Sequence, residues 1–269
     1  AEAEENASSA VAEENGSSSE AASSEAASSE AASSEAASTS AAAELTTVEA
    51  GKLTMATNAA FPPYEMTTDA GEFEGIDIDT AKAIADKLGL ELQIDDMDFD
   101  AALLSVQQGK ADIVMAGVTV TDERKAVMDF SDSYATGIQS IIVPEGSDIA
   151  SPDDLAGKKI GTQRGTTGYI YCSDDFGDDA VVAYDDGLTA VQALNNGQVD
   201  AVVIDNAPAK EFVAANPGLV ILDTSYAEED YAIGLAKGSA LEDAVNAALE
   251  ELKADGTLQS IVDKYIKAE

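Results

Sequence analysis

Residues Ala111–Ser131, ADIVMAGVTVTDERKAVMDFS, are the stretch that decides the fold. They predict a buried strand that ends near Ala116, a glycine turn at Gly117 and a helix that begins at Asp122. Backbone N–H groups are unpaired where an apolar strand leads through a glycine turn into a helix, and open α/β sheets bind ligands at such edges. The stretch therefore predicts a ligand crevice at the carboxyl end of a strand.

Arg124 is placed to reach this crevice. Its planar guanidinium, beside free N–H groups and the hydroxyls of Thr119 and Thr121, is suited to bind a carboxylate through two hydrogen bonds. The alternative is that Arg124 forms an ordinary ion pair with Asp122 or Asp129. Both interpretations stay open from this stretch alone.

Working outward, apolar runs and helical spacings alternate along the chain. A parallel α/β sheet with right-handed connections is the fold that such alternation predicts. The predicted strands are Leu53–Ala56, Leu90–Ile94, Ile113–Ala116, Lys159–Gly161, Val220–Leu222 and Tyr231–Leu235, and the predicted helices are Ile76–Leu88, Asp98–Gln108, Leu241–Leu252 and Leu258–Ile266.

A short internal repeat relates two parts of the chain. LSVQQGKADIVM, which starts at Leu104, matches QALNNGQVDAVV, which starts at Gln192, at an offset of 88 residues. In this register Gly117 corresponds to Asp205. Two similar α/β units that face each other would line one cleft with the loops after their strands, although chance similarity between two such units is the competing explanation.

Two loops carry further candidate residues. The segment before Pro62 and Pro63 cannot be helical and presents an asparagine and aromatic side chains. The segment Thr162–Gly168 combines glycines and threonines before a helix, which suits an anion but lacks the ending of a phosphate-binding loop. A plain turn with a threonine cap is the alternative there.

The order of these elements predicts two lobes. The chain leaves the first lobe near Thr136 and returns near Tyr231, so residues 47–135 and 232–269 would form lobe 1 and residues 136–231 lobe 2. Two crossings make a hinge, and closure of the lobes around a ligand is the expected motion.

Residues 1–46 differ from the rest of the chain. They contain ten glutamates and neither lysine nor arginine, so they carry −10 of the net charge of −38. With SSEAA repeats and almost no large apolar residues, this segment is expected to be a disordered, self-repelling tether. It resembles the spacer of bacterial surface lipoproteins, and a lipid anchor is inferred although no lipidated cysteine is in the sequence.

Composition excludes several classes of function. Cys172 is the single cysteine and histidine is absent, so an intrachain disulfide, the usual zinc sites and histidine-based catalysis are not expected. An acidic balance spread over the chain argues against nucleic-acid binding. No run of residues is apolar and long enough to predict a membrane span. No cofactor, metal site or catalytic residue is predicted.

Several separated stretches together resemble the extracellular amino-acid-binding proteins of the polar amino-acid ABC transporters. They are TNAAFPPYE, GIDIDTAKAIADKLG, MDFDAALLSVQQGKADIVMAGVTVTDERKAVMDFS, GTQRGTTG and VDAVVIDNAPA, in order over about residues 48–269. The resemblance implies a two-lobed type II periplasmic-binding-protein fold of class α/β, with two parallel-type sheets and a free L-amino acid in the cleft. It implies an extracytoplasmic, monomeric protein that delivers its ligand to an ABC permease, and no enzyme.

The resemblance also assigns roles to ten residues. Arg124 would bind the α-carboxylate with Thr119, Thr166 and Thr167, and Asp205 would bind the α-ammonium with the carbonyl of Gly117. Phe61 and Phe99 would enclose the ligand stem, and Asn58 and Gln163 would set selectivity. Tyr64 and Glu65 are assigned to the rim or to structure.

The ligand is expected to be a neutral polar amino acid such as glutamine, serine or cystine. Relatives that hold a cationic side chain often have an acid where this chain has Asn58. Lysine or arginine comes next, because the negative field of the protein attracts cations. A sensor module and a dehydratase built on the same fold are the remaining alternatives. The dehydratase needs a general acid, and no second carboxylate in the motifs is expected to face the cleft.

Overall fold

The computed structural model describes residues 45–267, which belong to one compact unit. The predicted tether, 1–46, therefore lies outside the described residues except for its last two. The described part of the chain is mixed α and β, and none of its helices is long and apolar enough to cross a membrane.

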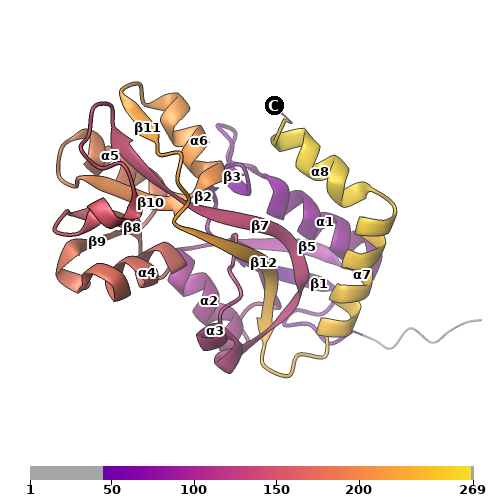
Figure 1. Cartoon of the computed structure of the whole chain (residues 1–269). Coiled ribbons are helices and arrows are strands. Elements are labelled where there is room, and N and C mark those ends of the chain that lie inside the picture. Colours follow the sequence, from indigo (N-terminus) through magenta and orange to yellow (C-terminus); the bar gives the residue numbers. More distant parts are fainter. Residues whose placement is uncertain (1–44, 268–269) are drawn as a thin grey trace, which may run out of the picture. The chain divides into compact units, whose positions relative to one another are not determined.

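One curled sheet runs through the whole unit (Figure 1). Its strands, in spatial order, are β5 (Glu91–Asp96), β1 (Lys52–Thr57), β6 (Ile113–Val114), β12 (Ala227–Ala236), β7 (Met128–Pro144), β10 (Ala201–Asp205), β8 (Ile160–Gln163) and β9 (Val181–Tyr184), with β11 (Leu219–Ile221) paired to β7. β5, β1 and β6 are parallel to one another, as are β10, β8 and β9. The two predicted parallel sheets are thus two parallel groups within a single sheet.

The long antiparallel strands β7 and β12 join the two groups. Their register pairs Thr136 with Asp230 and Ala135 with Tyr231. The two predicted crossings of the chain, near Thr136 and Tyr231, therefore lie side by side between the two groups of elements in Figure 1. The division of the chain into two lobes at these positions stays a prediction.

Helices cover the sheet on both sides of these crossing strands. They are α1 (Ile76–Leu88), α2 (Phe99–Gln107), α3 (Asp122–Val127), α4 (Thr167–Phe176), α5 (Gly187–Asn195), α6 (Asn206–Ala215), α7 (Glu242–Ala254) and α8 (Thr257–Tyr265), with single 3₁₀ turns at Pro152–Leu155 and Asp178–Ala180. α1 has the predicted bounds because its apolar residues recur at helical spacing and are buried. It ends at Gly89, whose φ of 68° lies in the left-handed region that a C-cap requires.

Each parallel group of strands carries its own helices. α1 and α2 contact β1, whereas α4 and α5 contact β8, β9 and β10, and α6 contacts β10 and β7. α7 and α8 pack on α1. This arrangement leaves the carboxyl ends of β1, β6, β8 and β10 free for loops that carry polar side chains.

The sequence did not predict every element. A separate three-stranded sheet of β2 (Ala60–Phe61), β3 (Glu65–Thr67) and β4 (Phe73–Glu74) forms around the two prolines, where an extended loop was expected. β9 was also missed. The strands of the small sheet are only two or three residues long, which is too short to show a periodic pattern.

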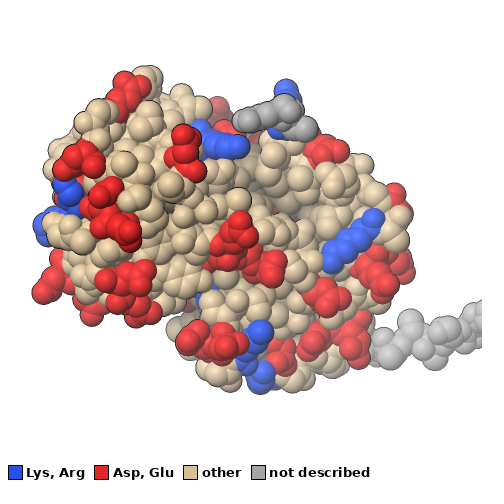
Figure 2. All heavy atoms as spheres, viewed as in Figure 1, with Lys and Arg blue, Asp and Glu red and all other residues tan. Residues whose placement is uncertain are grey.

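The surface is acidic over the face that Figure 2 shows, with few lysines or arginines between the acidic side chains. This distribution agrees with the composition of residues 47–269, which carry a formal charge of −28. Like charges at this density repel one another.

Candidate ligand-binding site

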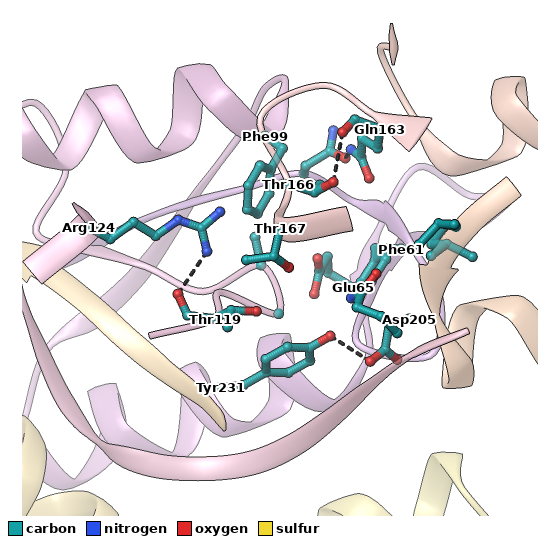
Figure 3. A pocket seen from close by; sticks show the side chains of 16 residues that line it. Phe61, Glu65, Phe99, Thr119, Arg124, Gln163, Thr166, Thr167, Asp205 and Tyr231 are labelled. Atoms are coloured by element: carbon teal, nitrogen blue, oxygen red, sulfur yellow. Dashed lines mark hydrogen bonds between the residues drawn. The ribbon is translucent and has the colours of Figure 1, made fainter. Parts of the chain in front are cut away.

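All ten predicted site residues line a single pocket (Figure 3), which has an empty volume of about 440 Å³. The pocket lies at the carboxyl ends of β1, β6, β8 and β10, as the parallel topology requires. Its lining consists of Asn58, Phe61, Glu65, Phe99, Ala116, Gly117, Thr119, Arg124, Gln139, Gln163, Thr166, Thr167, Val203, Ile204, Asp205 and Tyr231.

Arg124 forms one end of this pocket. Thr121 caps α3 by accepting the Arg124 N–H, which fixes the helix start at the predicted place. Arg124 as a whole is 7% exposed, and its guanidinium donates to the carbonyls of Thr119 at 2.8 Å and Gly165 at 3.1 Å. It also lies over the ring of Phe99, 5.5 Å from the centroid. Its hydrogen-bond partners among residues 45–267 are neutral carbonyls, so no carboxylate occupies the guanidinium directly and it is available to an anion.

The alternative ion pairs of Arg124 are not what the structure shows. The Asp129 carboxylate pairs with Lys237 at 2.7 Å, and the Asp122 carboxylate lies 3.8 Å from Lys125. Burial lowers the pKa of Arg124, whereas the negative charge of Glu229 raises it. An arginine still stays charged in such a site.

Two threonine hydroxyls near Arg124 already donate hydrogen bonds within the protein. The Thr119 hydroxyl donates to Glu229 at 2.9 Å, and the Thr166 hydroxyl donates to the carbonyl of Gln163 at 2.8 Å. Thr166 is also the N-cap of α4, and Thr167 is the buried first residue of that helix. Because the first amides of a helix have no partner within it, the α4 N-terminus is suited to a carboxylate.

Asp205 forms another side of the pocket and is almost fully buried. One carboxylate oxygen accepts the Ala207 N–H as the cap of α6, and the other accepts the Ile138 N–H at 2.9 Å and the Tyr231 hydroxyl at 2.7 Å. Burial raises the pKa of Asp205 to about 6, although these hydrogen bonds lower it. Asp205 is thus both a helix cap and a pocket residue.

Gly117 occupies a position that excludes other residues. Its φ is 56°, and its N–H donates to Asp77 at 2.9 Å. A Cβ at this position would lie 3.0 Å from Phe61 and 3.2 Å from Tyr231. The backbone can approach both rings only because no side chain is present.

Asn58 and Gln163, predicted to set selectivity, are bonded to each other. The Gln163 amide donates to the Asn58 oxygen at 2.8 Å and to the Asp185 carbonyl at 3.2 Å. The Asn58 amide donates to the carbonyl of Met97 at 2.9 Å. These contacts tie the loop after β1 to the loop after β8 and occupy the polar groups of Asn58.

The aromatic residues form a connected group. Phe61 stacks on Tyr64 with ring centroids 5.8 Å apart, and Tyr64 meets Tyr231 edge to face at 5.4 Å. Phe99 instead contacts the guanidinium of Arg124. Both predicted phenylalanines therefore line the pocket, and Phe99 also supports a second lining residue, Arg124.

Sequence reasoning missed Gln139 and Tyr231 as pocket residues. Gln139 and Tyr231 enter the pocket from β7 and β12, and Gln139 donates to Glu229 at 3.0 Å. Tyr231 appeared only as an apolar strand residue. The signal for both was their position at the predicted crossings, where two strands pass the cleft.

Glu65 is the largest correction to the predicted site. It was assigned to the rim or to structure, yet its side chain is fully buried and lines the pocket (Figure 3). The expectation that no second carboxylate faces the cleft is therefore wrong. Burial raises the pKa of Glu65 well above its ordinary value, and the nearby carboxylates of Asp77 and Asp205 raise it further.

Comparison with known proteins places this pocket in a family. The family model for bacterial extracellular solute-binding proteins, family 3, matches residues 53–268. The chain belongs to this family. The L-cystine-binding protein TcyJ of Escherichia coli is 33% identical to this chain over 226 residues, which cover 82% of this chain and 85% of TcyJ.

Solved structures of other family 3 proteins have the same type II periplasmic-binding-protein fold. The arginine-, lysine-, histidine-binding protein ArtJ of Geobacillus stearothermophilus aligns with a TM-score of 0.78 and 34% identity, over 81% of this chain and 96% of ArtJ. An ancestral arginine-binding protein bound to glutamine aligns with a TM-score of 0.77 and 43% identity, over 81% and 99% of the two chains. The predicted family and fold are confirmed.

Proposed function

We propose that this protein captures a free L-amino acid outside the cytoplasm and delivers it to an ABC importer in the membrane. The observation that carries the proposal is a buried pocket whose lining contains a buried arginine hydrogen-bonded only to carbonyls among residues 45–267, Arg124, and a buried carboxylate, Asp205. A zwitterion loses the hydration of both charges on entering such a pocket, so each charge needs a partner of opposite sign.

Arg124 binds the ligand α-carboxylate in this proposal, together with the first amides of α4. Asp205, held in place by Tyr231, binds the α-ammonium with the Gly117 carbonyl. The relatives support an amino acid as ligand, because those named above bind cystine, arginine, lysine, histidine or glutamine. They do not select one side chain, and the neutral polar ligand predicted from Asn58 stays a proposal.

Hinge closure between lobe 1 and lobe 2 accompanies binding in this proposal. The bonds from Gln163 to Asn58 and from Arg124 to the Gly165 carbonyl cross between the two predicted lobes. They support a closed form in which the ligand is shielded from water. A monomer, carried on a lipid-anchored tether, would present this form to the permease.

Substitution of Arg124 tests the proposal. The loss of charge-assisted hydrogen bonds of about 1.5–3 kcal/mol each should lower the affinity for the bound amino acid more than 100-fold in Arg124→Ala. Isothermal titration against the twenty amino acids and cystine measures the effect. Unchanged affinity would contradict the proposed carboxylate site.

Arg164→Ala is the matched control. The chain has two arginines, and Arg164 is half-exposed, outside the pocket and 3.5 Å from Asp185. The control changes the net charge by the same amount and should leave the affinity unaltered. A similar loss in both variants would indicate a general electrostatic effect in place of a specific contact.

A dehydratase is the second candidate, because Glu65 is a buried acid in the pocket. A carboxyl that keeps its proton near neutral pH is a possible general acid. Incubation of the protein with arogenate, followed by measurement of released phenylalanine, tests this reaction. The relatives named above are solute-binding proteins, and this supports binding without catalysis.

A further inference from the structure

The charged residues of the pocket lining do not balance. They are Glu65, Arg124 and Asp205, whose formal charges sum to −1 when all three are ionised. An amino acid with a neutral side chain has no net charge near pH 7, so the lining would balance only if Glu65 stayed protonated in the complex. An amino acid with a cationic side chain would balance the lining with Glu65 ionised.

Glu65 is the lining carboxyl that has no donor. No hydrogen-bond donor among residues 45–267 reaches either of its oxygens, whereas Asp205 accepts three hydrogen bonds. A buried carboxylate without a donor costs several kcal/mol. In the free protein, Glu65 avoids this cost by keeping its proton, which it can share with the adjacent carboxyl of Asp77.

Asn58 offers little to a ligand, although the neutral polar prediction depended on it. Its oxygen accepts from Gln163 and its amide donates to the Met97 carbonyl. These bonds use one N–H and one lone pair of the Asn58 amide and hold the side chain in place, so less of its hydrogen-bonding capacity is left for a ligand. Glu65 accepts no hydrogen bond from an amide, hydroxyl or cationic group among residues 45–267, and its side chain lies inside the pocket in Figure 3.

We propose that Glu65 selects the ligand, and that the pocket takes an L-amino acid with a positively charged side chain, of the lysine and arginine class. The inference rests on the proposed function, in which Arg124 and Asp205 bind the two backbone charges. The third charge of the ligand then lies against Glu65, which is ionised in the complex. The proton that Glu65 loses passes to solvent.

Matched ligand pairs test the inference on the unaltered full chain. Citrulline has the shape of arginine without its charge, and norleucine has the four-carbon side chain of lysine without the terminal ammonium. Isothermal titration should give roughly tenfold or higher affinity for the charged member of at least one pair. Equal or tighter binding of the neutral members would overturn the inference.

A variant tests the residue itself. Glu65→Gln keeps the size of the side chain and removes its charge, so the affinity for arginine or lysine should fall roughly 10- to 100-fold while citrulline and norleucine bind as before. Glu72→Gln, at an exposed position outside the pocket, makes the same charge change and should alter nothing. Full retention of arginine and lysine affinity in Glu65→Gln would overturn the assignment.

Failure of the inference and failure of the proposed function give different results. If the full chain binds a neutral amino acid best and Arg124→Ala abolishes that binding, the proposed function stands and the inference is wrong. If no amino acid binds the unaltered protein, both are wrong. Melting temperatures of the variants show whether each has folded.

Discussion

The helix, glycine and strand that lead to Gly117 and those that lead to Asp205 are built alike but end differently. The glycine of each unit has nearly the same backbone angle, with φ of 67° at Gly109 and 69° at Gly197. In each, the helix ends in the same hydrogen-bonded turn and a buried strand follows, β6 or β10. The short internal repeat predicted from the sequence, whose two copies are 88 residues apart, is therefore also a repeat in structure.

The difference lies in the side chains at and beyond the carboxyl end of each strand. The first unit continues through Gly117 to the cation Arg124, whereas the second ends in the carboxylate of Asp205. One unit thus supplies the positive partner and the other the negative partner for a ligand between them. The same local structure can hold opposite charges because the strand fixes only where the following loop lies.

A buried carboxyl also lies at the strand end of each unit. These two carboxyls give the largest expected effect, which is on the pH dependence of folding stability. Asp77 bonds to Gly117 in the first unit, and burial raises its pKa to about 6, the same value as for Asp205. The ordinary value is 3.8. Between about pH 4 and pH 6 the folded state therefore binds more protons than the unfolded state, and stability falls as the pH rises.

The fall should reach roughly 2 kcal/mol per group between pH 4.5 and pH 7.5. Urea unfolding of the ligand-free protein at these two pH values measures it. Asp77→Asn should remove its share of the pH dependence, whereas Asp86→Asn, at an exposed position on the same helix, should not. Equal stability at both pH values would show that the two buried carboxyls have ordinary pKa values.

Asp205→Asn should have the next largest effect, on ligand affinity. The amide keeps one oxygen for the helix cap but loses the negative charge opposite the ligand ammonium, so affinity should fall roughly 10- to 100-fold. Isothermal titration with the best amino acid measures it. Asp200→Asn, exposed and outside the pocket, should bind as the unaltered protein does; if Asp205→Asn does too, the two units do not divide the ligand charges as proposed.

The smallest expected effect concerns the stability that the equivalent aspartates of the two units contribute. Asp112 and Asp200 occupy the same place in the two units, but the buried Asp112 accepts the N–H groups of Val48 and Thr54, both at 2.8 Å. The exposed Asp200 accepts only the Lys159 N–H. Asp112→Asn should cost about 2 kcal/mol of unfolding free energy and Asp200→Asn under about 1 kcal/mol. Equal losses by urea unfolding would show that burial does not distinguish the two sites.

Local patterns were sufficient for most of the fold. The apolar spacing of α1 and its stop at Gly89 gave both ends of that helix, and the alternation of strands and helices indicated the two parallel groups. The order of the motifs indicated the family, and all ten predicted residues line one pocket. The short strands β2, β3 and β4 were missed because a strand of two or three residues has no readable period.

Contacts between distant segments were beyond local reasoning. Asn58 and Gln163 are 105 residues apart, and nothing near either one indicates that each uses the other's amide. Glu65 follows two prolines in a polar segment, so its complete burial could not be read from its neighbours. β7 and β12 bring Gln139 and Tyr231 to the pocket through pairing across the molecule.

The sequence by itself determined the α/β fold, the family and the place where a charged ligand would bind, because helix spacing, glycine stops and strand ends are local properties. The tertiary structure alone decided which polar groups are still available inside the pocket. Hydrogen bonding and burial there depend on segments that meet only after folding. For this reason the sequence pointed to Asn58 as the selecting residue, and the structure points to Glu65.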